Sequence, residues 1–316
     1  MVSRRYLRIK TMQALYAHGI KPYEEIQVAE NELIANIKNC YQLFLWFFSI
    51  LPEIAFYRVK KMEDLKSKHN PTYEDLHPNT KFIDNQIIHQ IEDNLTLKKL
   101  FPRYHINWSE DTDVIIMLFH AMEEMDCYKK YMSKKDSSYE EDKQLIFNII
   151  EQLFAENEHL RWFFGEKNPH WIDDYEEALA MFYKNIEDFK LSKGDDCKIN
   201  GLFKNRIDDE EFCRSLFRKT IENDAIYQKM IEEKLQNWEA DRVIGMDMLL
   251  MKMAICELLN FPTIPVKVTM NEYIDLAKYY SSDKSKVFVN GILDKLIVDF
   301  RDQEMLCKTG RGLFQN

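Results

Sequence analysis

Three features of the sequence predict an all-α fold. Apolar residues recur at helical spacing along almost the whole chain. The 316 residues include only 8 glycines and 8 prolines, which favours long helices over many tight turns. With 46% hydrophobic and 30% charged residues, the chain has the composition of a folded protein. Its length allows one large core or two modest ones.

Several function classes are disfavoured by the sequence. Six scattered cysteines, with no CxxC pair and no His/Cys cluster at metal spacing, indicate reduced thiols in a cytosolic protein and no bound metal. The start of the chain has no apolar stretch of a secretory signal, and Pro52 interrupts the most apolar run, 41–56, so we expect no membrane span and a cytoplasmic location. Because there is no Gly-rich phosphate loop and no nucleophile elbow, we expect no catalytic residues and no cofactor.

The first predicted helix, over residues 4–20, carries a concentrated positive charge. Residues 1–23 contain five Lys or Arg and no acid. Helical spacing places Arg5 on the same side as Tyr16, with Arg4 and Arg8 close by. Guanidinium groups bind phosphates and an aromatic ring can stack on a base, so this combination suits single-stranded RNA. A solvated terminus, with Tyr16 packed on a neighbouring helix, explains the same residues.

The middle of the chain, residues 24–205, is acidic, with 22 Lys or Arg against 34 Asp or Glu. It contains a loose repeat in which an Asn precedes a Trp by 14 or 15 residues: Asn94 and Trp108, Asn157 and Trp171, Asn223 and Trp238. We interpret each copy as a helix–turn–helix unit in which the Trp anchors the entrance to the second helix.

The final third predicts three helices. Residues 241–259 are apolar nearly all round, which is typical of a central bundle helix. Pro262 and Pro265 end that helix, and Thr269 followed by Glu272 has the spacing of a capping box for the next one. The last helix begins near residues 282–283 and contains Gly291, which costs a helix interior about 1 kcal/mol relative to alanine. Either close helix packing or the approach of a nucleotide could compensate for this cost.

Three ordered motifs resemble one protein family. They are "MQALYAH" after the arginine-rich start, "AICELLNFPTIPVKVTMNEYIDLAKYYS", and "FVNGILDK". Together they are similar to the bacterial transcription antitermination factor NusB, over roughly residues 4–20 and 209–300. The resemblance implies a helical bundle of two packed subdomains. It also implies binding of boxA-type single-stranded RNA jointly with NusE, a small-subunit ribosomal protein, and indirect contact with other Nus factors and RNA polymerase.

The resemblance also implies site residues, transferred position by position. The RNA-binding residues would be Arg4, Arg5, Arg8, Tyr16, Lys286, Phe288 and Asn290. The partner-binding residues would be Tyr16, Glu257, Asp283 and Lys284. Two positions depart from the family pattern: Val287 stands where a lysine usually precedes the phenylalanine, and Lys284 stands where relatives have an acid. Lys286 could replace the missing lysine.

The predicted organisation is a NusB-like core interrupted by a long insertion. Residues 1–20 form its first helix, 21–205 an inserted acidic helical region, 206–300 the rest of the core, and 301–316 a tail. The expected function is RNA binding in transcription antitermination that promotes processive transcription of rRNA operons. The alternatives are a protein-interaction scaffold that has lost RNA binding and, with less support, an accessory RNA-modification protein.

Overall fold

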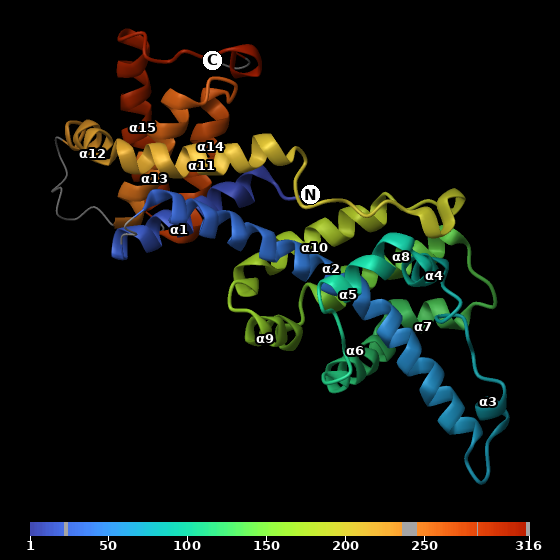
Figure 1. Cartoon of the computed structure of the whole chain (residues 1–316). Coiled ribbons are helices and arrows are strands. Elements are labelled where there is room, and N and C mark those ends of the chain that lie inside the picture. The colour runs from blue at the N-terminus through green and yellow to red at the C-terminus, as the bar shows by residue number, and fades with distance from the viewer. Residues whose placement is uncertain (22–24, 236–244, 283, 314–316) are drawn as a thin grey trace. The chain divides into compact units, whose positions relative to one another are not determined.

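The structure is a computed structural model that describes residues 1–21, 25–235, 245–282 and 284–313. Its described residues form helices, turns and irregular segments without a strand, so the all-α prediction is confirmed (Figure 1). The chain divides into two compact units. Unit 1 comprises residues 1–2 and 38–204, and unit 2 comprises residues 3–37 and 205–316.

Unit 1 is built around the C-terminal part of the longest helix, α2. Its elements are α2 (Ile26–Lys66, from residue 38 on), α3 (Tyr73–Leu76), α4 (Gln86–Asp93), α5 (Leu95–Arg103), α6 (Thr112–Glu124), α7 (Asp126–Ser133), α8 (Tyr139–Ile149), the π-helix η1 (Ile150–Phe154), α9 (Glu158–Lys167), α10 (Trp171–Glu187) and the 3-10 helix η2 (Leu191–Asp196). The apolar run of α2 supplies a row of aromatic and aliphatic side chains that are fully buried, among them Phe44, Phe47 and Phe48. The interior of unit 1 is therefore organised by one helix.

The predicted Asn–Trp repeat is confirmed in part for its first two copies: each Trp lies at or just before the start of a helix, but a helix, not a turn, follows each Asn. Asn94 and Asn157 are the N-caps of α5 and α9, where their side-chain oxygens accept backbone N–H groups. Trp171 is the first residue of α10, and its Nε1 donates to the Asn39 carbonyl over 3.0 Å. Trp108 is buried four residues before α6 and donates to Ser49 Oγ. The third tryptophan, Trp238, lies outside the described residues.

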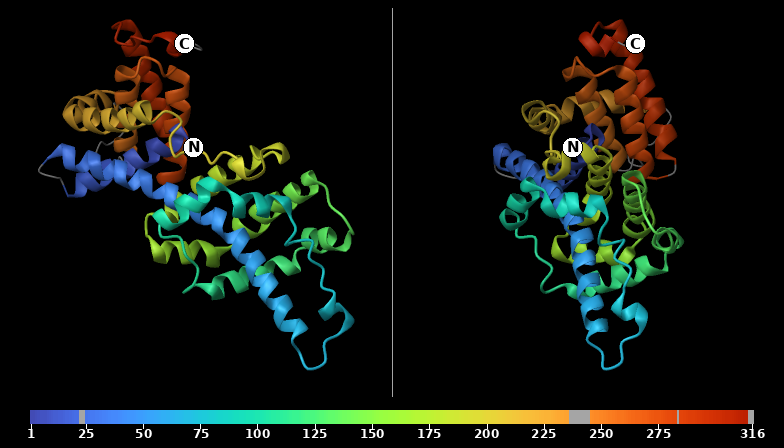
Figure 2. Two further views of the ribbon diagram at one scale, coloured as in Figure 1. Left: turned by 45° about the vertical axis from the view of Figure 1, so that its right-hand side comes forward. Right: turned by 90° about the vertical axis from the view of Figure 1, so that its right-hand side faces the viewer.

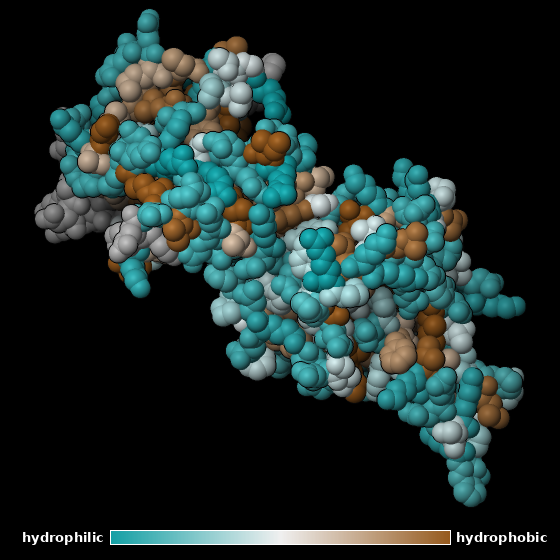
Figure 3. Space-filling model, in the orientation of Figure 1, coloured by the Kyte–Doolittle hydropathy of each residue, from teal (hydrophilic) through white to brown (hydrophobic). Residues whose placement is uncertain are grey.

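Helix α2 is long and apolar enough to cross a membrane, but 67% of its most apolar stretch is buried inside the structure. The core helix of a folded domain can be equally long and apolar, and the burial of these side chains accounts for the hydropathy of α2. Figure 3 shows a mainly hydrophilic surface on the face drawn, with apolar side chains in small groups.

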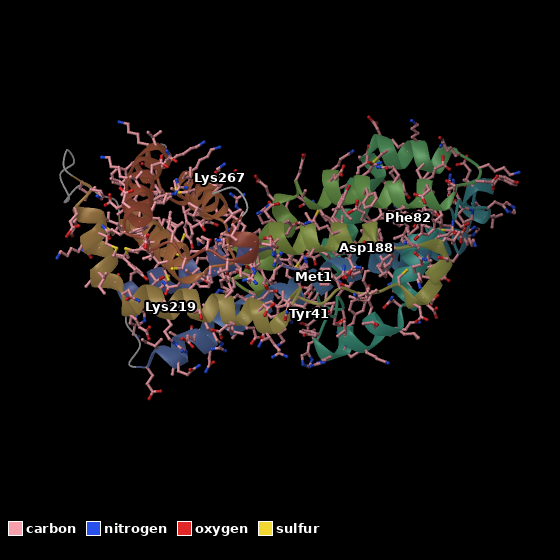
Figure 4. All side chains as sticks on the ribbon, turned by 90° about the horizontal axis from the view of Figure 1, so that it is seen from above. Met1, Tyr41, Phe82, Asp188, Lys219 and Lys267 are labelled. Carbon is pink, nitrogen blue, oxygen red and sulfur yellow. The ribbon has the colours of Figure 1, made fainter. Side chains whose placement is uncertain are left out.

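Unit 2 contains α1 (Arg4–Ile20), the first turns of α2, α11 (Arg206–Glu222), α12 (Asp224–Glu232), α13 (Gly245–Asn260), α14 (Val266–Tyr280), α15 (Ser285–Asp302) and the 3-10 helix η4 (Gly310–Leu313). Helix α13 contacts α1, α11, α12, α14 and α15, so it is the central helix of this bundle, as its all-round apolar sequence predicts. Helices α13, α14 and α15 lie side by side (Figure 2). Figure 4 marks Lys219 on α11 and Lys267 on α14, two helices of the same bundle.

The start of α2 belongs to unit 2, although the sequence placed residues 21–205 in the insertion. Glu30 is fully buried and accepts hydrogen bonds from Arg218 Nε at 2.6 Å and Arg218 Nη2 at 2.7 Å. Arg214 Nη1 lies 3.4 Å from the same carboxylate. Both arginines are on α11, so this acid ties the first turns of α2 to the bundle, and the long segment of unit 1 begins only at residue 38.

The C-terminal segment after α15 packs on the turn between α13 and α14. The backbone N–H of Thr309 donates to the Pro262 carbonyl over 2.9 Å, and Lys308 Nζ donates to the Phe261 carbonyl over 3.1 Å. A Cβ added at Gly312 would lie 2.0 Å from the Pro262 carbonyl oxygen, so this close approach requires glycine. The predicted tail is thus held to the core up to residue 313.

Candidate nucleic-acid interface

The predicted first helix and α1 coincide, but its three arginines lie in very different surroundings. Arg8 is 3% exposed and makes two hydrogen bonds of 2.8 Å to Glu257, which is fully buried on α13. Burial alone would lower the pKa of Arg8, but the Glu257 carboxylate, together with Tyr273 and Glu272, raises that pKa above its ordinary value. Arg8 is therefore a permanently charged member of a buried pair.

Two further side chains complete the surroundings of Glu257. Thr269 Oγ1 donates to it over 2.8 Å, and the Tyr273 hydroxyl donates over 3.3 Å. Burial and the adjacent carboxylate raise the pKa of Tyr273 well above its ordinary value, which keeps the hydroxyl protonated as a donor. This network joins α1, α13 and α14. It satisfies a buried acid with one cation and two hydroxyl groups.

The network corrects three expectations from the sequence. Arg8 was expected to contact RNA and Glu257 a partner, but each neutralises the other in the interior and neither reaches the surface. Thr269 was expected to cap a helix, but α14 begins at Val266 with Pro265 as its N-cap residue. The backbone of Pro265 is already extended there, so the helix starts one turn earlier and leaves Thr269 inside it.

Arg4 and Arg5 remain half-exposed at the start of α1. Arg4 Nη2 lies 3.0 Å from Asp209 on α11, and its guanidinium stands 4.5 Å from the centre of the Phe212 ring. Arg5 Nη2 donates to Asp275 on α14 over 2.6 Å, and its Nε lies 3.5 Å from Glu272. Both guanidinium groups are accessible from solvent, and both already have carboxylate neighbours.

Tyr16 lies near the other end of α1, about 16 Å farther along the helix at 1.5 Å per residue. Its ring is 51% exposed and lines a cavity of about 450 Å³ together with Gly245 and Met248 at the start of α13. The start of α13 also contacts α15, because Ser285 Oγ donates to Asp247 over 2.8 Å. Tyr16 and the first turn of α15 therefore flank the same end of α13.

The first turns of α15 present the remaining predicted residues. Lys284 and Lys286 are exposed, and Phe288 is half-buried. Asn290 is half-buried and donates to Asp294 over 3.0 Å, within the same helix. Val287, which replaces the family lysine, is 76% exposed. Asp283, a predicted partner contact, lies outside the described residues.

One group of residues at this end of the bundle was not predicted from the sequence. Tyr279, which is 70% exposed, and the neighbouring Lys278 and Tyr280 end α14 immediately before the residues just described. Lys278 Nζ stands 5.6 Å from the centre of the Tyr279 ring. The sequence feature that could have indicated these residues is the run "KYY" in the second motif of the family resemblance, where a basic residue precedes two aromatic ones.

Comparison with known proteins identifies a family and several relatives. The NusB family model matches residues 176–298. The transcription antitermination protein NusB of Salinibacter ruber is 36% identical over 146 residues, which cover 45% of this chain and 89% of the relative. The chain belongs to the NusB family. The NusB protein of Bacillus subtilis is 34% identical over 128 residues, covering 39% of this chain and 92% of the relative. That of Chloroherpeton thalassium is 39% identical over 104 residues, covering 33% of this chain and 49% of the relative. No solved structure matches the chain.

The NusB family match begins earlier than the motifs in the sequence indicated. It starts at residue 176, inside α10, whereas the sequence motifs that resemble the family begin at about residue 209. Residues 176–205 were assigned to the insertion, and most of them belong to unit 1. The NusB-related part of the chain therefore extends from unit 2 into the last helix of unit 1.

Gly291 is not explained by close helix packing. It is exposed on α15, and a Cβ added there would have nothing within 4 Å.

Gly291→Ala should therefore raise the free energy of unfolding by about 1 kcal/mol, the helix-propensity difference between the two residues. Urea unfolding followed by circular dichroism measures this. The matched control is Gly312→Ala, which should destabilise the protein because its Cβ would meet the Pro262 carbonyl. A destabilised Gly291→Ala variant would contradict the open surroundings of Gly291.

Proposed function

We propose that this chain is a transcription antitermination factor that binds boxA-type single-stranded RNA jointly with NusE, a small-subunit ribosomal protein. It would act in the cytoplasm on rRNA operons, with indirect contacts to other Nus factors and RNA polymerase, and through binding alone, without catalysis. Family membership supports the antitermination role, since the relatives are named transcription antitermination proteins.

The observation that carries the RNA-binding part is the surface at one end of unit 2. Exposed aromatic rings (Tyr16, Tyr279) and exposed lysines (Lys284, Lys286) stand around the start of α13, with the half-buried Phe288 beside them. Single-stranded RNA is bound by rings that stack on bases and by cations that contact phosphates. Arg4 and Arg5 would add phosphate contacts at the far end of α1. The open surface at Gly291 leaves room for a nucleotide beside Phe288.

A binding titration tests this function. A fluorescently labelled boxA-type RNA is titrated with the full chain, with and without the ribosomal protein, and a scrambled RNA of equal length serves as the control. We expect tighter binding of the boxA-type RNA and a further gain when the ribosomal protein is added. Equal binding of both RNAs would overturn boxA recognition. Binding of the ribosomal protein without binding of RNA would instead favour the scaffold alternative.

Two variants test the stacking role directly. Tyr16→Leu and Phe288→Leu should each weaken RNA binding by about 1–3 kcal/mol, the usual contribution of a base stacked on an aromatic ring. Tyr16→Leu should leave the unfolding midpoint nearly unchanged, because the ring is half exposed. Ile226→Leu, at an exposed residue of α12, is the matched control and should leave both properties unchanged. Normal RNA binding by a less stable variant would assign that ring to the core.

A further inference from the structure

The three arginines at the start of α1 differ in how firmly carboxylates hold them. Arg8 is enclosed with Glu257, and both side chains are almost fully buried. Arg4 is 42% exposed, but its partner Asp209 is only 7% exposed. Arg5 is 39% exposed, and its partner Asp275 is 46% exposed. The Arg5–Asp275 pair is therefore the one in which both groups face solvent.

Exposure of the acid decides whether the arginine can be released. Separating Arg4 from Asp209 would leave a nearly buried carboxylate without its cation, although Asp209 also accepts the backbone N–H of Asn205 over 3.2 Å. Removing one partner of a buried charge is costly, whereas two exposed charges regain water when they separate. Arg5 can therefore leave Asp275 at little cost, and it is the arginine best placed to exchange a carboxylate for another anion.

We propose that Asp275 competes with an RNA phosphate for Arg5 and so holds RNA affinity below what the arginines alone would give. This inference rests on the proposed RNA-binding function and adds a regulatory element to the same site. Carboxylate and phosphate oxygens accept hydrogen bonds from the same guanidinium fork, so Arg5 cannot offer its full set of donors to both at once. Glu272 lies 3.5 Å from Arg5 Nε and 3.8 Å from Arg8 Nη1, so it contacts both arginines and keeps Arg8 as a neighbouring cation when Arg5 turns to a phosphate.

The test is a double-mutant cycle on the full chain with boxA-type RNA. Asp275→Asn should tighten RNA binding about two- to fivefold, the factor that an exposed ion pair is worth. In the Arg5→Ala background, Asp275→Asn should change RNA affinity by much less, because the competing pair no longer exists. Glu233→Gln removes the same charge from an exposed residue at the end of α12 and serves as the control for a general charge effect.

Several outcomes would overturn the competition between Asp275 and phosphate. An equal gain from Asp275→Asn with and without Arg5 would do so, as would an equal gain from Glu233→Gln, because both results indicate a general effect of charge. Unchanged RNA binding by Asp275→Asn would also overturn it. Absence of RNA binding by the wild-type chain would instead refute the proposed function. The gain should shrink as salt rises from about 0.05 to about 0.3 M, because screening weakens exposed pairs.

Discussion

Replacing Arg8 with alanine should lower the free energy of unfolding by about 3–5 kcal/mol, the usual cost of leaving one member of a buried ion pair without its partner. In this protein the remaining charge would be Glu257, which is fully buried and would keep only the Thr269 and Tyr273 hydroxyl groups as donors. Two hydroxyl groups cannot replace a bidentate guanidinium. Because small domains are stable by only about 5–15 kcal/mol, this single change should remove a large part of the stability of unit 2.

Urea unfolding followed by circular dichroism measures the effect. Arg5→Ala is the matched control: it removes the same side chain from the same helix, but from a half-exposed pair, and should cost less than about 1 kcal/mol. The double variant Arg8→Met with Glu257→Gln should be more stable than Arg8→Ala, because it removes both charges and keeps an acceptor for the hydroxyl groups. A decrease below about 1 kcal/mol for Arg8→Ala would show that Glu257 is solvated or protonated without its partner.

The buried position of Arg8 also determines how RNA-binding variants of the arginines should be interpreted. A variant that removes Arg4, Arg5 and Arg8 together would lose RNA binding through unfolding, whatever the arginines contact. Variants of Arg4 and Arg5 alone leave the buried network intact. For each phosphate of a single strand that a variant no longer neutralises, the slope of log affinity against log salt should fall by about 0.7. The phosphate-binding role of α1 is therefore tested at Arg4 and Arg5.

Local features of the fold could be predicted from the sequence. The helix expected over residues 4–20 is α1, and Asn94 and Asn157 cap helices where their repeat suggested a turn. These features depend on residues a few positions apart, which spacing and capping preferences capture. The exposure of Lys284 and Lys286 also agrees with their predicted place in a surface site, while their contacts with RNA or a partner remain proposals.

Features that depend on distant residues could not be predicted in the same way. Arg8 and Glu257 are 249 positions apart, and Glu30 and Arg218 are 188 positions apart. Helical spacing gathers the basic residues near one side of α1, but it gives no means of knowing that an acid from α13 meets one of them. The sequence likewise places Glu30 in the acidic region 21–205, because the charge of this region gives no information about the arginines of α11 that contact Glu30. In both cases the pairing arises from tertiary packing.

Because residues 3–37 belong to unit 2, a shortened chain without unit 1 should fold only if it keeps the first turns of α2. A version that joins residues 1–22 to 206–316 through a short flexible linker follows the boundaries taken from the sequence. It lacks Glu30 and the buried side chains of Leu33, Ile34 and Ile37. Burying three such side chains stabilises a fold by about 4–9 kcal/mol, an upper estimate that is comparable with the whole stability of a domain. We therefore expect this version not to fold cooperatively.

A version that joins residues 1–37 to 205–316 retains these side chains and the contacts of Glu30 with Arg214 and Arg218. We expect it to unfold cooperatively in urea, because every residue assigned to unit 2 is present. Introducing Leu33→Ala and Ile34→Ala into this version should move its behaviour toward that of the shorter one, since each change costs about 2–5 kcal/mol. Circular dichroism and the sharpness of the urea transition distinguish the three chains.

If the version without residues 26–37 were equally stable, the first turns of α2 would be an attachment to unit 2 and not part of its core. If neither version folded, unit 2 would depend on the rest of the chain, and the NusB-related bundle would need α10, where the family match begins.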